Sequence, residues 1–272
     1  MLHVLSPSHT GTRIDAKLTT LERVLLILPT LVGLTFGLFP LLLPKTFADV
    51  AQFPADDVFV YQLAGAATLG YGVVCLLDIF WGSWLAIRLP TIALVPFNLL
   101  ALAVCIITIA TTNAPYSVYL LLTPTILLSS LSIWLLWRYR HVTRPEQDLA
   151  QLPVRLFLTI GTLAAGTFGV LPLVAPQLGT LVHLRINAPF IAQMAGAASF
   201  GYAVMTVFAQ RALSSLELRL PIVMAAIFNG VAGVACIPFI FSGDVIILPI
   251  LIAPVGLAVL VGTLIGLRRT MA

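Results

Sequence analysis

The sequence predicts an all-α integral membrane protein with eight transmembrane helices, arranged as two parallel-related repeats of four helices each. Hydrophobic residues make up 60% of the 272 residues, charged residues make up only 9%, and the mean hydropathy is +1.08. A soluble domain could not bury so many apolar side chains. The apolar residues also come in runs of about twenty, which is the length of helix that crosses a hydrocarbon core of roughly 30 Å.

Eight apolar runs, bounded by charged residues, proline or glycine, give the expected spans. In chain order they are 24–44, 59–80, 90–110, 118–137, 156–176, 190–209, 221–241 and 245–267. We expect the third and seventh helices to begin at Pro90 and Pro221, because proline suits the first turn of a helix. The first run has a copy inside the chain, so we interpret it as a retained helix and not as a cleaved signal.

Three motifs occur twice in the same order, which indicates an internal duplication. T-F-G-L-F-P at 35–40 returns as T-F-G-V-L-P at 167–172, and A-G-A-A-T-L-G-Y-G at 64–72 returns as A-G-A-A-S-F-G-Y-A at 195–203. R-L-P-T-I-A-L-V-P-F-N at 88–98 returns as R-L-P-I-V-M-A-A-I-F-N at 219–229. We divide the chain into a leader (1–22), a first four-helix repeat (23–137), a basic linker (138–154) and a second repeat (155–269). Because each repeat has an even number of spans, both should enter the membrane in the same direction.

The positive charges predict the orientation in the cell membrane, with both termini in the cytoplasm. Two basic residues, Lys45 and Arg185, fall on the opposite side. All four tryptophans fall at the expected cytoplasmic boundary, as an interfacial aromatic belt requires. The basic residues on the cytoplasmic side are Arg13, Lys17, Arg23, Arg88, Arg138, Arg140, Arg144, Arg155, Arg211, Arg219, Arg268 and Arg269.

The sequence lacks the residues or motifs that several classes of function require. The three cysteines lie inside apolar runs, and the four histidines lie in the leader or loops, so neither a metal site nor an intramembrane haem is expected. No nucleotide-binding or hydrolase motif is present, so we expect no catalytic residues, no cofactor and no enzyme activity. The basic residues form no continuous patch, which argues against nucleic acid as a partner.

Asp78 is the one acidic residue inside the expected spans. It lies close to the cytoplasmic end of the second helix, and the corresponding position in the other half is Ala209. We interpret it as an interfacial acid that reaches water or pairs with Arg88, with a functional acid as the alternative.

A small set of neutral polar residues recurs in both halves, and it is the candidate site. The helical period places Thr68 at about the same depth as Asn98, and Ser199 at about the same depth as Asn229, so we expect these groups to meet across helices. They act either as hydrogen-bonding contacts between helices or as the lining of a cavity. The full cluster is Gln62, Thr68, Asn98, Gln193, Ser199 and Asn229.

Glycines at helical spacing predict where helices approach one another closely. Gly33 and Gly37 form a G-x-x-x-G pair, and the equivalents in the second half are Ala165 and Gly169. We expect packing roles and not ligand roles for Gly33, Gly37, Gly65, Gly72, Gly169 and Gly196.

Two functional hypotheses lead. The first is a non-enzymatic scaffold or accessory subunit that packs against another membrane protein within the lipid bilayer, because such a role needs few charges. The second is a small transporter or flippase for a neutral or lipid-like substrate, with a cavity at the interface of the two repeats. A charged ligand is disfavoured, since the spans hold almost no countercharge.

Overall fold

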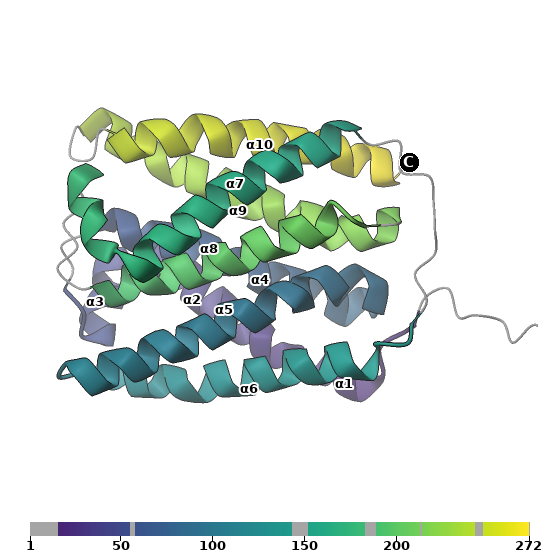
Figure 1. Ribbon diagram of the computed structural model, residues 1–272, viewed down its shortest axis with the longest axis horizontal. Helices are drawn as coiled ribbons and strands as arrows, with labels where there is room; N and C mark the ends of the chain where they lie inside the picture. Colours follow the sequence, from purple (N-terminus) through teal and green to yellow (C-terminus); the bar gives the residue numbers. More distant parts are fainter. Residues whose placement is uncertain are drawn as a thin grey trace, which may run out of the picture.

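A computed structural model describes residues 16–54, 58–142, 152–182, 189–212, 214–242 and 247–271. Its long helices run roughly along one common axis, which is horizontal in Figure 1. Eight helices in these ranges are long and apolar enough to cross a membrane, which confirms the predicted all-α, multi-pass membrane fold. Residues 1–15 of the expected leader and 143–151 of the expected linker lie outside the described part of the chain.

The eight spans agree with the predicted apolar runs, apart from their ends. The first span consists of two helices, α1 and α2, that meet at Leu26. Pro29 has no N–H to donate to the carbonyl of Leu25, which accounts for a break at this point. The helices are α1 (Thr20–Leu25), α2 (Ile27–Leu42), α4 (Val58–Trp81), α5 (Trp84–Thr111), α6 (Tyr116–Arg138), α7 (Leu152–Val174), α8 (Pro189–Ala209), α9 (Ser215–Ser242) and α10 (Ile247–Met271).

The prediction that the third and seventh helices begin at Pro90 and Pro221 is wrong, because both prolines lie inside their helices. The Ser83 side chain accepts a hydrogen bond from the N–H of Ala86 at 3.3 Å and caps α5. Ser214 accepts one from Glu217 in the same way at the start of α9. A serine cap satisfies N–H groups that would otherwise be unpaired, so it decides the helix start.

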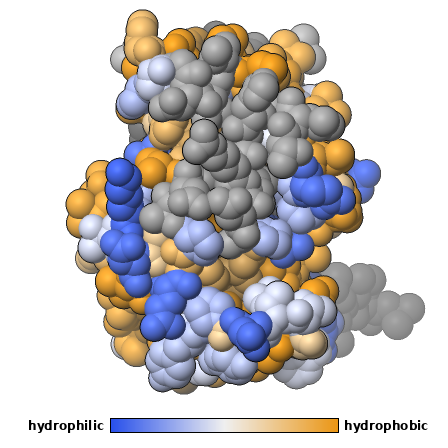
Figure 2. Space-filling view, turned by 90° about the vertical axis from the view of Figure 1, so that its left-hand side faces the viewer, coloured by the Kyte–Doolittle hydropathy of each residue, from blue (hydrophilic) through white to orange (hydrophobic). Residues whose placement is uncertain are grey.

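Two short helices at one end of the bundle were not predicted, α3 (Pro44–Ala51) and the 3-10 helix η1 (Pro176–Val182). We call this the far end, and the end where α1, α5 and α9 begin the arginine-rich end. In Figure 1 the far end is on the left. Figure 2 shows the far end face-on, with hydrophilic side chains beside apolar ones, as expected where a membrane protein meets water.

Two close helix crossings join α2 to α4 and α7 to α8, and glycines lie at both. A Cβ on Gly33 would lie 2.5 Å from Cα of Gly72, and one on Gly37 would lie 2.7 Å from Cα of Leu69. Gly65 faces the carbonyl of Gly37, so the two backbones are in direct contact along this crossing. In the second half, Gly169 faces Phe200, and Gly196 faces the carbonyl of Gly169.

The second and third helices of each half pack against helices of the other half more than against each other. Helix α4 packs against α2 and against α9, and α8 packs against α7 and against α5, while α4 and α8 also contact each other at the centre. By contrast, α4 has little contact with α5, although the two are adjacent in the chain, and α8 has little contact with α9. Each half therefore places its third helix against the second helix of the other half.

The centre of the bundle is solid where the two halves meet. The Tyr71 hydroxyl donates to the carbonyl of Ala198 at 2.9 Å, which joins α4 to α8. A Cβ on Gly201 would lie 2.5 Å from that hydroxyl and 2.7 Å from the carbonyl of Ala93, so α8 approaches α5 closely. Toward the arginine-rich end this packing continues through Trp84, which is 2% exposed.

Gly72 offers a test of the close crossing. Its Cβ would lie 2.6 Å from the backbone nitrogen of Leu34, so Gly72→Ala should lower the free energy of unfolding by about 1–3 kcal/mol. The measurement is unfolding in SDS followed by far-UV circular dichroism. Gly166 is the matched control, because its Cβ would meet only the Cβ of Ala203 at 3.9 Å. Gly166→Ala should be neutral or stabilise by up to about 1 kcal/mol, and equal losses in both variants would contradict this account.

Candidate functional site

The gap between α4 and α5 contains an apolar cavity, which we call cavity 1. Its volume is about 90 Å³. It extends from the middle of the bundle, at Leu94 and Leu128, to the far end, at Ala51 and Phe53. Helices α2, α4, α5 and α6 line it, and the beginning of α8 completes the wall with Phe190, Ile191 and Met194.

A second cavity, cavity 2, lies among α7, α8, α9 and α10 and has a volume of about 230 Å³. Val60 and Leu63, at the beginning of α4, complete its wall. At the far end it reaches Pro176 and Gly179 of η1. Each cavity is thus lined mainly by one half of the chain and completed by one helix of the other half.

The two cavities use corresponding residues of the two halves. Thr68 and Asn98 line cavity 1, while Ser199 and Asn229, which occupy the same places in the repeated motifs, line cavity 2. The same correspondence holds for Phe97 with Phe228, Ala101 with Ala232, Ala64 with Ala195, Phe36 with Phe168 and Pro40 with Pro172. Chance placement of two unrelated pockets would not produce such a match.

In cavity 1 the expected hydrogen bonds across helices are replaced by bonds within each helix. Thr68 Oγ1 donates to the carbonyl of Ala64 at 2.8 Å, and Asn98 Nδ2 donates to the carbonyl of Leu94 at 2.8 Å. A side chain can satisfy its donor four residues back along its own helix without a partner opposite. Thr68 and Asn98 therefore share a cavity without needing to bond to each other.

The second half shows one contact of the expected kind. Asn229 Nδ2 donates to the carbonyl of Ala225 at 2.9 Å and also lies 3.3 Å from the Tyr202 hydroxyl on α8. Tyr202 corresponds to Tyr71 in the first half. Sequence reasoning missed both tyrosines, although the repeated G-Y pair that contains them was visible in the duplicated motif.

The two glutamines of the candidate cluster are not among the lining residues of either cavity. Gln62 Nε2 donates to the carbonyl of Leu41 at 3.3 Å and so joins α4 to α2. Gln193, at the corresponding position of α8, is half-buried. Asp78 is fully buried, and its Oδ1 accepts a hydrogen bond from the backbone N–H of Ser83 at 3.2 Å, which fixes the turn between α4 and α5.

The described lining of both cavities is apolar apart from neutral polar groups. Among the lining residues placed by the structure there is no Asp, Glu, Lys, Arg or His. Nor do the described residues contain a cluster of three metal-binding side chains. Such cavities suit an apolar molecule with a single neutral hydrogen-bonding group, because a buried charge would lack compensation.

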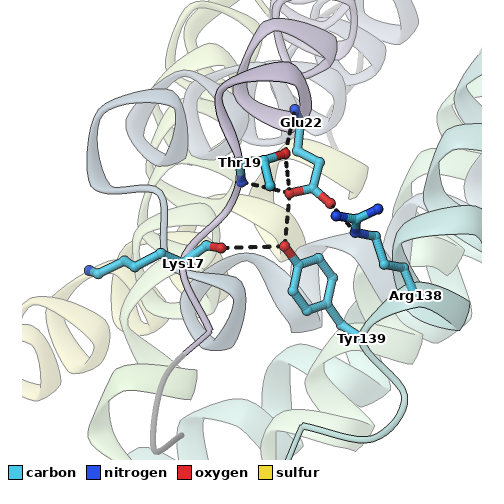
Figure 3. Close-up of polar contacts among 5 residues, drawn as sticks. All are labelled: Lys17, Thr19, Glu22, Arg138 and Tyr139. Atoms are coloured by element: carbon cyan, nitrogen blue, oxygen red, sulfur yellow. Dashed lines mark hydrogen bonds and ion pairs between the residues drawn. The ribbon is translucent and has the colours of Figure 1, made fainter.

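A polar cluster at the arginine-rich end is the other notable group of side chains (Figure 3). Glu22 is fully buried, and its carboxylate accepts hydrogen bonds from Thr19 at 2.7 Å and from the Tyr139 hydroxyl at 2.8 Å. Its other oxygen lies 2.7 Å from Nε of Arg138. The cluster ties the start of α1 to the end of α6. The T-x-x-E pattern of a capping box at Thr19 was the sequence signal that could have predicted it.

Tyr139 remains a hydrogen-bond donor in this cluster. Burial, followed by the hydrogen bond to the Glu22 carboxylate, raises the pKa of Tyr139 to about 12. Its ring stacks on Trp84 with the centroids 4.6 Å apart. The surroundings of Glu22 are therefore filled by protein side chains, and we interpret the cluster as a structural tie.

Charged contacts also join the two halves at this end. Arg88 Nη1 of α5 lies 3.2 Å from Oε1 of Glu217 on α9, and Glu217 is fully buried. Arg219, which corresponds to Arg88, lies over the Trp81 ring of α4 at 5.4 Å. Both arginines thus reach from one half to the other.

Comparison with protein-family models, curated proteins and solved structures gives no match for this chain. Its function must therefore be argued from the cavities and from the contacts around them.

Glu22 offers a test of the tie at the arginine-rich end. Glu22→Gln keeps the shape of the side chain but removes the charge that faces Arg138, and it places an amide where three donors converge. We expect a loss of about 2 kcal/mol in the free energy of unfolding, measured by tryptophan fluorescence during SDS titration. Arg140→Gln is the control, because Arg140 is exposed over Trp137, and it should cost less than about 1 kcal/mol. An equal effect of the two substitutions would sink the interpretation.

Proposed function

We propose that this protein is a small membrane carrier that binds neutral, lipid-like molecules in cavities 1 and 2. The observation that carries the proposal is the pair of apolar cavities at corresponding positions, each with one asparagine in its wall. A scaffold has no need for two matched hollows, since the side chains that line a hollow lose packing contacts. A ligand-binding protein needs such spaces.

The chemistry of the walls suggests the class of ligand. Leucine, phenylalanine, alanine and proline side chains form most of both linings, which suits a hydrocarbon tail. Asn98 and Asn229 each supply an amide that can orient one hydroxyl, carbonyl or ester group. A neutral lipid with one small polar group meets both requirements.

The position of the cavities changes the transporter hypothesis in one respect. From the sequence we expected one cavity at the interface of the two repeats. That interface is packed solid by Tyr71, Ala198 and Gly201, and one cavity lies on each side of it. The cause is that the third helix of each half packs against the second helix of the other half. This arrangement closes the centre and separates α4 from α5.

The proposal includes an orientation and a symmetry for the carrier. We propose that the arginine-rich end faces the cytoplasm, which the gathering of Arg23, Arg88, Arg138 and Arg219 at that end supports. We also propose that the two four-helix repeats are related by an axis along the membrane normal. The corresponding linings of the two cavities support this relation.

Filling the cavities tests the proposed function. Ala101 and Ala232 line cavities 1 and 2, so the double substitution Ala101→Phe with Ala232→Phe should occupy both spaces. Native mass spectrometry after extraction in mild detergent should detect retained neutral lipid on the unmodified protein. We expect the retained amount to fall by about tenfold or more in the filled variant, which corresponds to a lost binding free energy of about 1.4 kcal/mol.

The control places the same side chains on the lipid-facing surface. Leu99 and Val234 lie on the same two helices and are 45% and 58% exposed. Leu99→Phe with Val234→Phe should leave lipid retention unchanged. Equal retention in filled and control variants would contradict the carrier proposal, and a stable protein subunit in place of a lipid would favour the accessory-subunit hypothesis.

A further inference from the structure

The two cavities differ in volume by more than twofold, although many of the residues in their walls correspond. One difference stands out in an otherwise matched stretch. The sequence F-V-Y-Q begins α4 at Phe59, and F-I-A-Q occupies the same place on α8 from Phe190. Tyr61 therefore lines cavity 1 where Ala192 lines cavity 2.

Tyr61 fills space at the far end of cavity 1 and also holds the chain segment that covers it. Its side chain is 3% exposed, and its hydroxyl donates to the carbonyl of Pro54 at 2.9 Å. Its ring packs edge-on against Phe47 of α3, with the centroids 5.9 Å apart. Phe47 in turn packs against Phe36 and Phe39 of α2.

The covering segment is α3 together with residues 52–54. Ala48 and Ala51 of α3 are buried, whereas Lys45 and Asp49 are exposed, so α3 lies with one face on the bundle. The Ser117 hydroxyl at the start of α6 donates to the carbonyl of Ala51 and holds the end of α3. Tyr61, Phe47 and Ser117 together form the wall of cavity 1 at the far end.

Cavity 2 has a different cover. The 3-10 helix η1 contributes Pro176, Leu178 and Gly179 to its wall. Ala192 is 5% exposed, and it has neither a ring to fill the cavity nor a hydroxyl to hold the cover. This exchange of tyrosine for alanine contributes to the larger volume of cavity 2.

We infer that cavity 2 is the site that takes up the neutral lipid-like ligand, and that Tyr61 keeps cavity 1 closed. This inference rests on the proposed carrier function and specifies which cavity performs it. Position 61 and its counterpart 192 decide access: a tyrosine fills the cavity and fastens the far-end cover, and an alanine leaves room for a hydrocarbon tail. Exchanging the two residues should therefore move the site from one half of the chain to the other.

The test uses the full-length protein in nanodiscs and a long-chain fatty alcohol that carries a diazirine for photolabelling. Labelled peptides are mapped with and without an excess of the unlabelled alcohol, so that saturable labelling is separated from labelling by bulk lipid. In the unmodified protein we expect saturable labelling of α7, α8 and α10 and none of α2 and α6. Ala192→Tyr should lower the cavity 2 labelling by about tenfold, on the scale of 1.4 kcal/mol for a tenfold change in binding.

The reverse substitutions test whether Tyr61 keeps the ligand out of cavity 1. Tyr61→Ala should add saturable labelling of α2 and α6, and the double exchange of Tyr61→Ala with Ala192→Tyr should move the labelling from the second half to the first. Val207→Tyr is the matched control on α8, since Val207 is 40% exposed and faces lipid, and it should change nothing. A monodisperse elution profile confirms that each variant is folded.

Two kinds of failure are distinguishable. Equal saturable labelling of both cavities in the unmodified protein would overturn the role of Tyr61 and leave the carrier function standing. The same conclusion would follow if folded Tyr61→Ala left cavity 1 unlabelled. The absence of saturable labelling in either cavity, in every variant, would overturn the carrier function and the inference together.

Discussion

The direct contact between α4 and α8 at the centre of the bundle determines the rest of this structure. The Tyr71 hydroxyl and the small side chains around Gly201 let the two helices and their neighbours approach closely. Once these two helices occupy the centre, α5 has to pack against α8, and α9 has to pack against α4. In a membrane such contacts depend on backbone proximity and shape, because lipid tails are as apolar as the side chains themselves.

This exchange also explains why there are two cavities and why they lie off-centre. Helix α4 is held by α2 and α9, so it cannot also close on α5. The space between α4 and α5 is left to side chains of alternating size, among them Ala64, Ala101 and Phe97. The same reasoning applies to α8 and α9 around cavity 2. Polar ties at the arginine-rich end keep that end closed, so the open volume extends toward the far end.

Hydropathy predicted most of the fold. Runs of apolar residues identified all eight spans, since length and composition alone decide whether a helix can cross a bilayer. The positions of Thr68 and Asn98 along their helices brought them to the same cavity, because rise per residue fixes depth. Their hydrogen bonds could not be predicted, since a hydroxyl or amide can turn back to its own helix.

The neighbours of each helix were beyond sequence reasoning. Small residues such as Gly72 on one face of a helix indicate that another helix packs against that face. They do not specify which helix it is, because any helix with a suitable surface could pack there. Helix α3 was missed because Pro44 ends an apolar run and begins a new helix at the same point. Repetition could not point to Tyr61, because this tyrosine occurs in one half only and the duplicated motifs identify residues that both halves share.

The exchanged packing has a consequence for how the protein is made. When the first four spans have left the ribosome, α4 still lacks α9 and α5 still lacks α8, and both of these helices are encoded more than a hundred residues later. The small residues that will later touch α8 and α9 must meanwhile face lipid or the insertion machinery. Completion of the bundle therefore waits for contacts between distant parts of the chain, which slows folding. Within the first half, α2 can pack on α4 and α5 on α6 before the second half is made.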